Sequence, residues 1–112
     1  MVLKHALRDM ERIRVLTAET RKEALEIVDH TDLSLVVLDL KMPDTDGFTL
    51  YEEIRAKKDI PGILMTGDRS METLQRIREL SIADYLTKPL DDAIARETVH
   101  NILHRNSYRL TD

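Results

Sequence analysis

One apolar stretch near the middle of the chain constrains its fold more than any other. Residues 35–38 are four consecutive aliphatic side chains, and they run directly into Asp39. A run without polar alternation is typical of a strand buried on both faces, as in a parallel sheet covered by helices. A loop punctuated by Pro43 and Gly47 follows. Asp39 is therefore expected at the carboxyl end of a strand, where open α/β sheets collect their functional groups. A lone aspartate there also suits a turn or a helix cap, so its role depends on its neighbours.

The composition fits one small globular domain. The chain has 112 residues, of which 42% are hydrophobic and 34% charged, unlike a disordered segment. A net charge of −4 gives no electrostatic basis for direct nucleic-acid binding. The absence of cysteine excludes disulfides, thiol catalysis and Cys-type zinc sites. No apolar run is long enough to span a membrane and no signal peptide is recognisable, so a cytoplasmic location without membrane association is expected.

Helical and strand patterns alternate along the whole chain. Apolar spacing predicts helices over residues 2–10, 20–30, 47–56, 70–80 and 91–104, with Thr20 and Ser70 as caps of the second and fourth. The buried face expected for the fourth helix consists of Met71, Leu74, Ile77 and Leu80. Short apolar runs predict strands over residues 12–18, 33–39, 60–66 and 83–87. Residues 105–112 are expected to be a polar tail or linker stub. This alternation implies a parallel sheet with helices on both faces.

Three polar residues fall at the carboxyl ends of three consecutive predicted strands. They are Asp39, Thr66 and Lys88. Parallel strands end at the same edge of a sheet, so these side chains are expected to lie close together. A carboxylate can act as a nucleophile and form an acyl phosphate. An ammonium and a hydroxyl can hold the phosphoryl oxygens. The set therefore predicts a phosphate site.

The motifs that contain these residues resemble the receiver domain of two-component response regulators. The motifs are VVLDLKMPDTDG at 36–47, ILMTG at 63–67 and ADYLTKP at 83–89. They occur in the family's order and at its spacing, and the resemblance covers essentially the whole chain. It implies an α/β, flavodoxin-like, doubly wound parallel sheet with strand order 2-1-3-4-5. The chain would then be a single receiver-like domain over residues 1–112, with 1–10 as a remnant of its first helix.

The resemblance also implies roles for individual residues. Asp39 would accept a phosphoryl group from a sensor histidine kinase or a phosphotransfer protein. Lys88 would bind that group, with a cis peptide bond to Pro89. Thr66 and Tyr85 would act as the switch that changes a partner-binding surface formed by the last two helices and the strand between them. The chain would be a phosphoacceptor signalling domain and not an enzyme, apart from its own phosphorylation and dephosphorylation.

A magnesium ion is the cofactor that the resemblance implies, with Asp39 and the main-chain carbonyl of Lys41 as ligands. Family members begin with a strand that ends in two acidic residues, which also hold the ion. This sequence has no such strand, and its first ten residues correspond to the end of the helix that follows it. We therefore expect magnesium binding to be weakened or absent, and phosphorylation to be slow or absent.

The missing strand would be the central one in the family's order. An unpaired apolar edge in that place favours pairing with another chain, as a homodimer or a strand-exchanged assembly. Three explanations remain open at this point. The protein is longer than this sequence, or an assembly covers the gap, or the chain is a degenerate receiver that works as a phosphorylation-independent interaction module. A smaller departure is Ser81-Ile82, where the family commonly has Gly-Ala.

Other functions and sites are weaker alternatives. Phosphatases with an aspartyl nucleophile usually need a second aspartate two positions later, where this chain has Lys41. A flavodoxin-like flavin site needs a Ser/Thr/Gly-rich phosphate loop, which is not present after the first strand. His100 and His104 have the i, i+4 spacing of a metal-binding pair, but an exposed pair is the simpler interpretation. Asp44 and Asp46 are expected to serve as loop and helix-cap residues.

Overall fold

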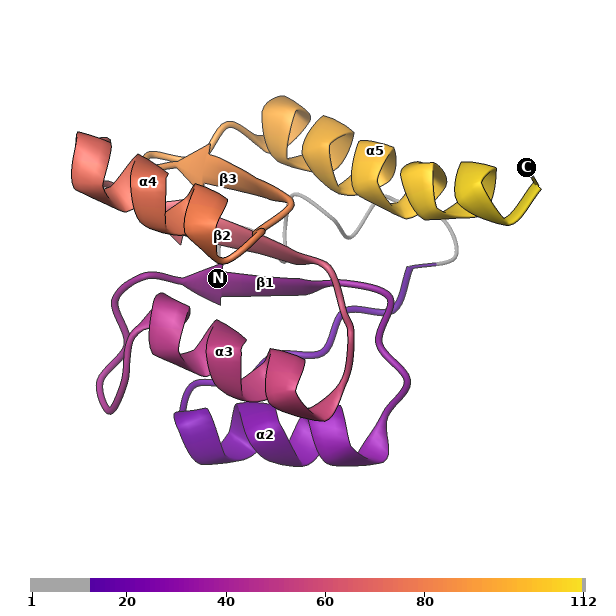
Figure 1. Ribbon diagram of the computed structural model, residues 1–112, viewed down its shortest axis with the longest axis horizontal. Helices are drawn as coiled ribbons and strands as arrows, with labels where there is room; N and C mark the ends of the chain where they lie inside the picture. Colours follow the sequence, from indigo (N-terminus) through magenta and orange to yellow (C-terminus); the bar gives the residue numbers. More distant parts are fainter. Residues whose placement is uncertain (1–12, 112) are drawn as a thin grey trace. The chain divides into compact units, whose positions relative to one another are not determined.

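The computed structural model describes residues 13–111, which form two compact units. The first unit runs from Thr17 to Lys88, and the second contains the last helix. The helices and strands are α2 (Arg21–His30), β1 (Val36–Asp39), α3 (Gly47–Lys57), β2 (Gly62–Thr66), α4 (Met71–Glu79), β3 (Asp84–Thr87) and α5 (Asp92–Thr111). Figure 1 shows this order along the chain. The predicted helix over residues 2–10 lies outside the described residues. None of the helices within residues 13–111 is long and apolar enough to cross a bilayer.

The sheet of the first unit has three parallel strands in the order β1-β2-β3 (Figure 1). Val36 of β1 is paired with Gly62 of β2, and Ile63 of β2 is paired with Asp84 of β3. A helix stands between each pair of successive strands, as parallel pairing requires. The expected α/β class with a parallel sheet is confirmed. These three strands are the last three of the four that the sequence pattern predicts.

The predicted strand over residues 12–18 is wrong for the part of it that the structure describes. Residues 13–18 contain no strand and take part in none of the pairings of the sheet. A strand is defined by its hydrogen-bonded partner. In the expected order, the only neighbour of this segment would be the strand that the sequence does not contain. Alternating apolar residues therefore did not suffice to form a strand here.

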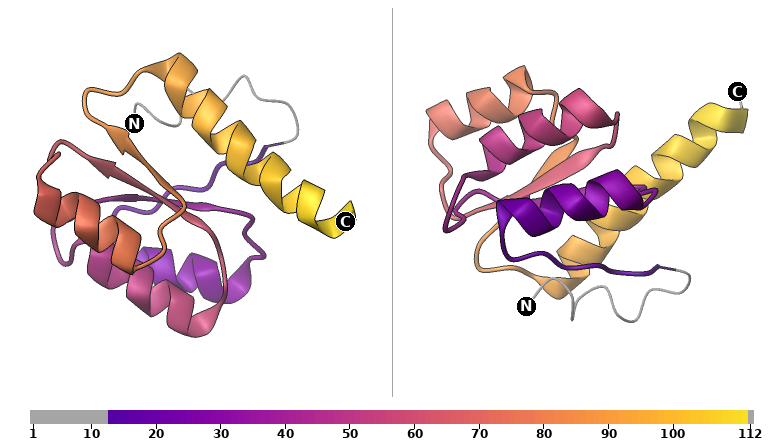
Figure 2. Two further views of the ribbon diagram at one scale, coloured as in Figure 1. Left: turned by 45° about the horizontal axis from the view of Figure 1, so that its top comes forward. Right: turned by 90° about the horizontal axis from the view of Figure 1, so that it is seen from below.

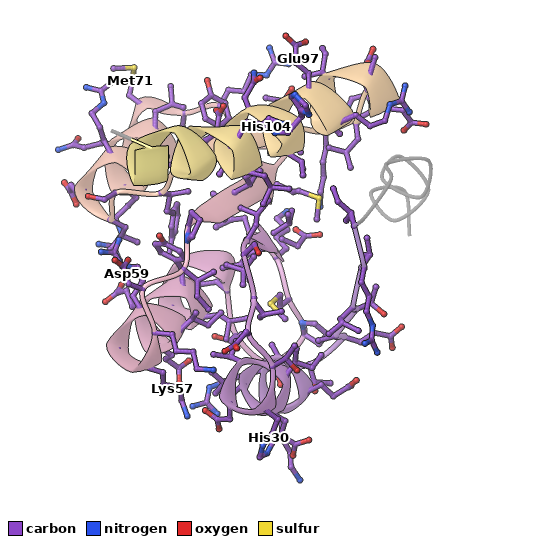
Figure 3. The ribbon with its side chains drawn as sticks, turned by 90° about the vertical axis from the view of Figure 1, so that its right-hand side faces the viewer. His30, Lys57, Asp59, Met71, Glu97 and His104 are labelled. Carbon is purple, nitrogen blue, oxygen red and sulfur yellow. The ribbon has the colours of Figure 1, made fainter. Side chains whose placement is uncertain are left out.

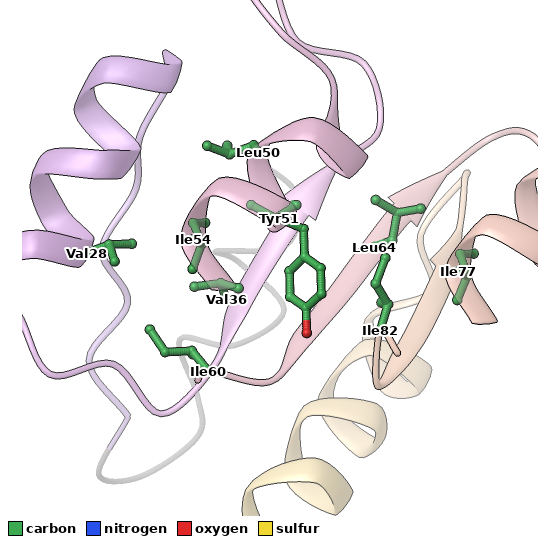
Figure 4. Close-up of a cluster of buried hydrophobic side chains, with 10 residues drawn as sticks. Val28, Val36, Leu50, Tyr51, Ile54, Ile60, Leu64, Ile77 and Ile82 are labelled. Atoms are coloured by element: carbon green, nitrogen blue, oxygen red, sulfur yellow. The ribbon is translucent and has the colours of Figure 1, made fainter. Parts of the chain in front are cut away.

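The core of the first unit joins its three helices to one face of the sheet (Figure 4). In β1, Val36 and Leu38 are buried in this cluster, while Val37 and Asp39 are half-buried, as the period of two in a strand requires. Figures 1 and 2 show α2 and α3 side by side against this part of the unit. The middle strand β2 is buried on both of its faces, since all five of its residues are buried. That burial explains the unbroken apolar sequence of β2.

Side-chain caps fix where the helices of the first unit begin. The side chains of Thr20, Asp46 and Ser70 accept hydrogen bonds from the main-chain N–H three residues later, at the start of α2, α3 and α4. The predicted caps are thus confirmed. Helix α4 is followed by Ser81 in the left-handed conformation, at φ 55°. The main-chain N–H of Ile82 donates to the carbonyl of Ile77, and both side chains lie in the core, which is the Schellman arrangement.

Two details of the predicted helices need correction. Met71 was expected on the buried face of α4, but it is 78% exposed. The buried stripe of α4 runs through Thr73 and Ile77, and Met71 lies about 120° around the helix from Ile77. The last helix was expected over residues 91–104, but α5 continues through Thr111. Neither glycine nor proline interrupts residues 105–111, so no helix-breaking residue stops α5 there.

Candidate functional site

Parallel pairing brings the three predicted site residues to one edge of the sheet. Asp39 is the last residue of β1, Thr66 is the last residue of β2, and Lys88 directly follows β3. The hydrogen-bond ladder continues to these residues, because the main-chain N–H of Lys88 donates to the carbonyl of Thr66 at 3.0 Å. The strand ends that carry the three residues lie together at the arrowheads in Figure 1. The sequence-based prediction of a common edge is therefore consistent with the geometry.

Asp39 and Lys88 are in direct contact. The Lys88 Nζ atom lies 2.9 Å from Oδ1 and 2.7 Å from Oδ2 of Asp39. The side chain of Lys88 is 41% exposed and that of Asp39 is 36% exposed, so the ion pair faces solvent. The main-chain N–H of Lys41 also donates to Oδ1 of Asp39, at 3.0 Å. The carboxylate is thus oriented by two donors and is accessible to a reactant from solution.

Thr66 reaches the same edge, but its hydroxyl is turned to its own loop. The side chain is buried, and its hydroxyl accepts from the main-chain N–H of Asp68 at 2.9 Å and donates to the Asp68 carbonyl at 3.2 Å. Tyr85 lies in β3, where it is paired with Leu64, and it is 37% exposed. Thr66 therefore contacts Lys88 through its main-chain carbonyl, while its hydroxyl is bound to the main chain of Asp68. Tyr85 lies at the surface.

The loop after β1 is attached to two helices by its acidic residues. Asp46 caps α3 by accepting from the main-chain N–H and the hydroxyl of Thr49, both at 2.9 Å. These hydrogen bonds hold the pKa of Asp46 below its ordinary value. Asp44 accepts from the main-chain N–H of Arg21, the first residue of α2, at 3.2 and 3.3 Å. The prediction that both aspartates serve as loop and cap residues is confirmed.

Gly47 allows this loop to pass close to the strand that carries Asp39. A Cβ atom at position 47 would lie 2.7 Å from the main-chain oxygen of Asp39 and 2.8 Å from a methyl carbon of Leu64. Both distances are shorter than real Cβ contacts. The main-chain N–H of Gly47 also donates to the carbonyl of Leu40 at 3.0 Å. The loop can therefore approach the end of β1 this closely only because residue 47 has no side chain.

Sequence reasoning missed the part played by Asp68. Its carboxylate accepts from the main-chain N–H of Ser70 and from the hydroxyl of Thr73, both at 2.8 Å. These donors lower its pKa, and Lys41 contributes a smaller electrostatic effect in the same direction. Asp68 therefore links the Thr66 hydroxyl to the start of α4. The sequence did contain a signal for these hydrogen bonds, because Asp68 lies two residues after a threonine and two residues before a serine.

A second missed interaction stabilises the surface beside the loop. The guanidinium of Arg21 in α2 forms a bidentate ion pair with Glu53 in α3. This contact lowers the pKa of Glu53 and raises that of Arg21. The same Arg21 carries the main-chain N–H that Asp44 accepts. No local sequence pattern predicts a pair between residues on two different helices.

Among the residues that the structure describes, those near Asp39 form a poor set of ligands for magnesium. Within residues 13–104, no three histidine or acidic side chains are gathered closely enough to hold a metal ion. The one carboxylate at the strand end, Asp39, already contacts the Lys88 ammonium. Magnesium keeps several water ligands and is usually anchored by one or two carboxylates that are free to bind it. A single carboxylate that is engaged by an ammonium, together with the Lys41 carbonyl, is a poor set of anchors for this ion.

Two of the sequence-based expectations concern residues of the second unit. Pro89 belongs to the second unit, and its cis peptide bond remains a prediction. His100 and His104 both lie on α5, in the second unit, and are exposed. The candidate site in the first unit therefore consists of Asp39, Lys88 and Thr66, with the main chain of Lys41 beside them.

Comparison with known proteins shows the family to which the chain is related. Residues 1–109 match the family described as the response regulator receiver domain. The regulatory protein VanR of Enterococcus faecium is 38% identical over 81 residues, which cover 70% of this chain and 34% of VanR. The probable transcriptional regulator ycf27 of Porphyridium aerugineum is 33% identical over 91 residues, which cover 81% of this chain and 38% of that protein. The chain thus spans about a third of the length of these relatives.

The fold is also that of solved structures. A two-component response regulator from Clostridium difficile superposes with a TM-score of 0.85 and 29% identity. The superposition covers 93% of this chain and 85% of that chain.

Proposed function

The chain belongs to the family of response regulator receiver domains, and we propose that it acts in phosphorelay signalling by accepting a phosphoryl group on Asp39. Receiver domains are in general signalling domains and not enzymes. The observation that carries the proposal is the contact of the Lys88 ammonium with both oxygens of Asp39 at the solvent-facing edge of the sheet.

The chemistry follows from these two groups. A carboxylate oxygen of Asp39 attacks the phosphorus of a phosphohistidine, a P–O bond forms, and the P–N bond breaks. The departing imidazole takes up a proton from solvent. The Lys88 ammonium stabilises the negative charge on the phosphoryl oxygens as a point charge. The product is an acyl phosphate on the side chain of Asp39.

The proposed switch uses Thr66 and Tyr85. For its hydroxyl to donate to a phosphoryl oxygen, Thr66 must give up its donation to the carbonyl of Asp68. That change would loosen the loop that leads into α4, since Asp68 also accepts from Ser70 and Thr73 at the start of that helix. Tyr85, which is partly exposed, would move inward in response. The surface around α4 and β3 would then change its partners.

The proposed partners follow from the same chemistry. A sensor histidine kinase or a phosphotransfer protein would supply the phosphoryl group. A homodimer or strand-exchanged assembly is supported by the edge of β1 opposite β2, which pairs with no strand among the described residues. The main-chain N–H groups of Val36 and Leu40 donate to residues at the ends of β2, so the main-chain groups of Val37 point to the opposite edge. Within the described residues, β1 is paired only with β2.

A phosphorylation-independent interaction module is the second candidate function. The observation that favours it is the poor fit of the described residues to magnesium, which receiver domains of this family bind. We infer that magnesium binding by this 112-residue chain is weak. In this alternative, the fold and its partner-binding surface are kept while phosphoryl transfer is slow or lost.

Incubation with acetyl phosphate separates these two functions. The intact mass of the chain is measured with and without magnesium, next to an Asp39→Asn variant, after circular dichroism has shown that both are folded. The proposal predicts an added phosphoryl group that is missing from the variant. A folded sample that gains no mass under either condition supports the phosphorylation-independent module instead.

A further inference from the structure

The outer surface of α5 carries two histidines that the proposed function does not use. His100 and His104 are four residues apart and therefore lie on the same face of the helix, and both side chains are exposed. Their rings are stacked, with centroids 3.8 Å apart and an angle of 29° between the planes. Figure 3 labels His104 on this helix, together with Glu97 one turn earlier than His100.

A hydrogen bond orients one of the two rings for metal binding. The Nδ1 atom of His104 lies 3.1 Å from the main-chain oxygen of His100. Because a carbonyl can only accept, this contact assigns the proton of the neutral ring to Nδ1. The lone pair then resides on Nε2, which is the atom left to bind a ligand. Metal-binding histidines commonly donate their other ring nitrogen to a carbonyl in this way, which fixes both tautomer and orientation.

The i, i+4 spacing of the two histidines allows them to share a metal ion. Two nitrogens that bind one tetrahedral zinc ion at about 2.0–2.1 Å are separated by about 3.3 Å. The stacked rings show that the two side chains lie side by side, and both rings must turn out of the stack to direct their Nε2 atoms at one ion. Paired histidines at i, i+4 on a helix are a known way to present two imidazoles to zinc.

We propose that His100 and His104 form a two-histidine site for a late first-row transition metal such as zinc. Imidazole nitrogen favours zinc, copper and nickel over magnesium, which prefers oxygen ligands. Within residues 13–104, no third histidine or acidic side chain completes a cluster with them, so water fills the remaining positions. Such a site is open, and it lies entirely on α5. It is therefore independent of phosphoryl transfer at Asp39.

Zinc titration by isothermal calorimetry tests the site on the whole chain. The proposal predicts one zinc ion per chain at metal excess, with affinity lowered by at least about tenfold in His100→Asn and in His104→Asn. His30→Asn is the matched control, because His30 is an exposed histidine of α2 with no histidine four residues away. That variant is expected to bind zinc as the original chain does. Replacing exposed side chains should leave folding intact, which circular dichroism verifies.

A second variant tests the spacing itself. Combining Asn101→His with His104→Asn keeps the number of histidines on α5 but places them at adjacent positions, which face different directions. The affinity of this variant should be as low as that of His104→Asn alone. Zinc should also raise the melting temperature of the original chain, because it binds the folded helix, and should raise it less in this variant. Unchanged zinc affinity in either single variant, restored affinity in the spacing variant, or no zinc binding by the original chain would overturn the proposal.

Discussion

The Lys88 ammonium lies within 2.9 Å of both carboxylate oxygens of Asp39, although the two residues are 49 positions apart in the sequence. Two parallel crossovers and one intervening strand bring them together. Because the pair is partly exposed, its contribution to folding is small, below about 1 kcal/mol. In the proposed function, the ion pair matters because it places a cation beside the oxygen atoms of Asp39 that would receive a phosphoryl group.

Lys88→Gln should therefore slow phosphorylation far more than it lowers stability. We expect the rate of labelling by acetyl phosphate to fall by roughly 10²-fold, as is typical when one charge-stabilising group is removed. The midpoint of urea unfolding should change little. Lys57→Gln is the matched control, since it removes an equally exposed lysine that pairs with Asp29 at the last residue of α3. Equal labelling rates for Lys88→Gln and the original chain would contradict the role given to Lys88.

Gly47→Ala should destabilise the fold and displace the end of β1. The new Cβ would be 2.7 Å from the main-chain oxygen of Asp39, and that backbone cannot yield without moving the strand. We expect a loss of about 1–3 kcal/mol in the free energy of unfolding, measured by urea denaturation. Gly67→Ala is the control, because a Cβ there meets no atom within 4 Å. Similar losses in both variants would mean that close packing at position 47 is not the cause.

Ser81→Gly should make the protein more stable. Ser81 follows α4 with φ at 55°, a conformation that costs a residue with a Cβ about 1–2 kcal/mol and costs glycine little. Part of this gain is offset because glycine is more flexible in the unfolded chain. A net increase of about 0.5–1 kcal/mol in the free energy of unfolding is expected by urea denaturation. A decrease would show that Ser81 makes a compensating contact.

The acid stability of the chain should depend on Asp46. Its pKa is lower in the folded state than in the unfolded state, mainly because of the main-chain N–H of Thr49. The ionised carboxylate therefore stabilises the fold above the ordinary aspartate pKa of about 3.9, and this stabilisation is lost as the pH falls through the lower folded value. Asp46→Ala should cost about 1 kcal/mol at pH 7. The difference from the original chain should shrink toward pH 3 in urea titrations, and a constant difference would exclude the ionised cap.

Local patterns were sufficient for much of this fold. Short-range sequence patterns predicted three kinds of feature. These are the strand that ends at Asp39, the helix starts at Thr20 and Ser70, and the buried strand β2. Strand ends in a parallel sheet must share an edge, so the contact between Asp39 and Lys88 could be inferred without coordinates. The candidate site was accessible from the sequence for that reason.

The errors arose where tertiary context decides. Residues 13–18 alternate like a strand, but a strand exists only with a partner. Met71 was assigned to the buried face of α4, yet the packed stripe passes through Thr73 and Ile77. The ion pair between Arg21 and Glu53 joins two helices whose adjacency the local pattern does not encode. Each miss concerns which surfaces meet, which depends on the assembled unit and not on a short window of sequence.

Locating the phosphoryl group tests the central claim most directly. After incubation with acetyl phosphate, borohydride reduces an aspartyl phosphate to homoserine, and tandem mass spectrometry of peptides identifies the altered position. The account predicts homoserine at position 39 and unmodified aspartate at Asp44, Asp46 and Asp68, which are engaged in capping or loop hydrogen bonds. Homoserine at any of these other positions, or none at position 39 in a folded sample, would contradict it.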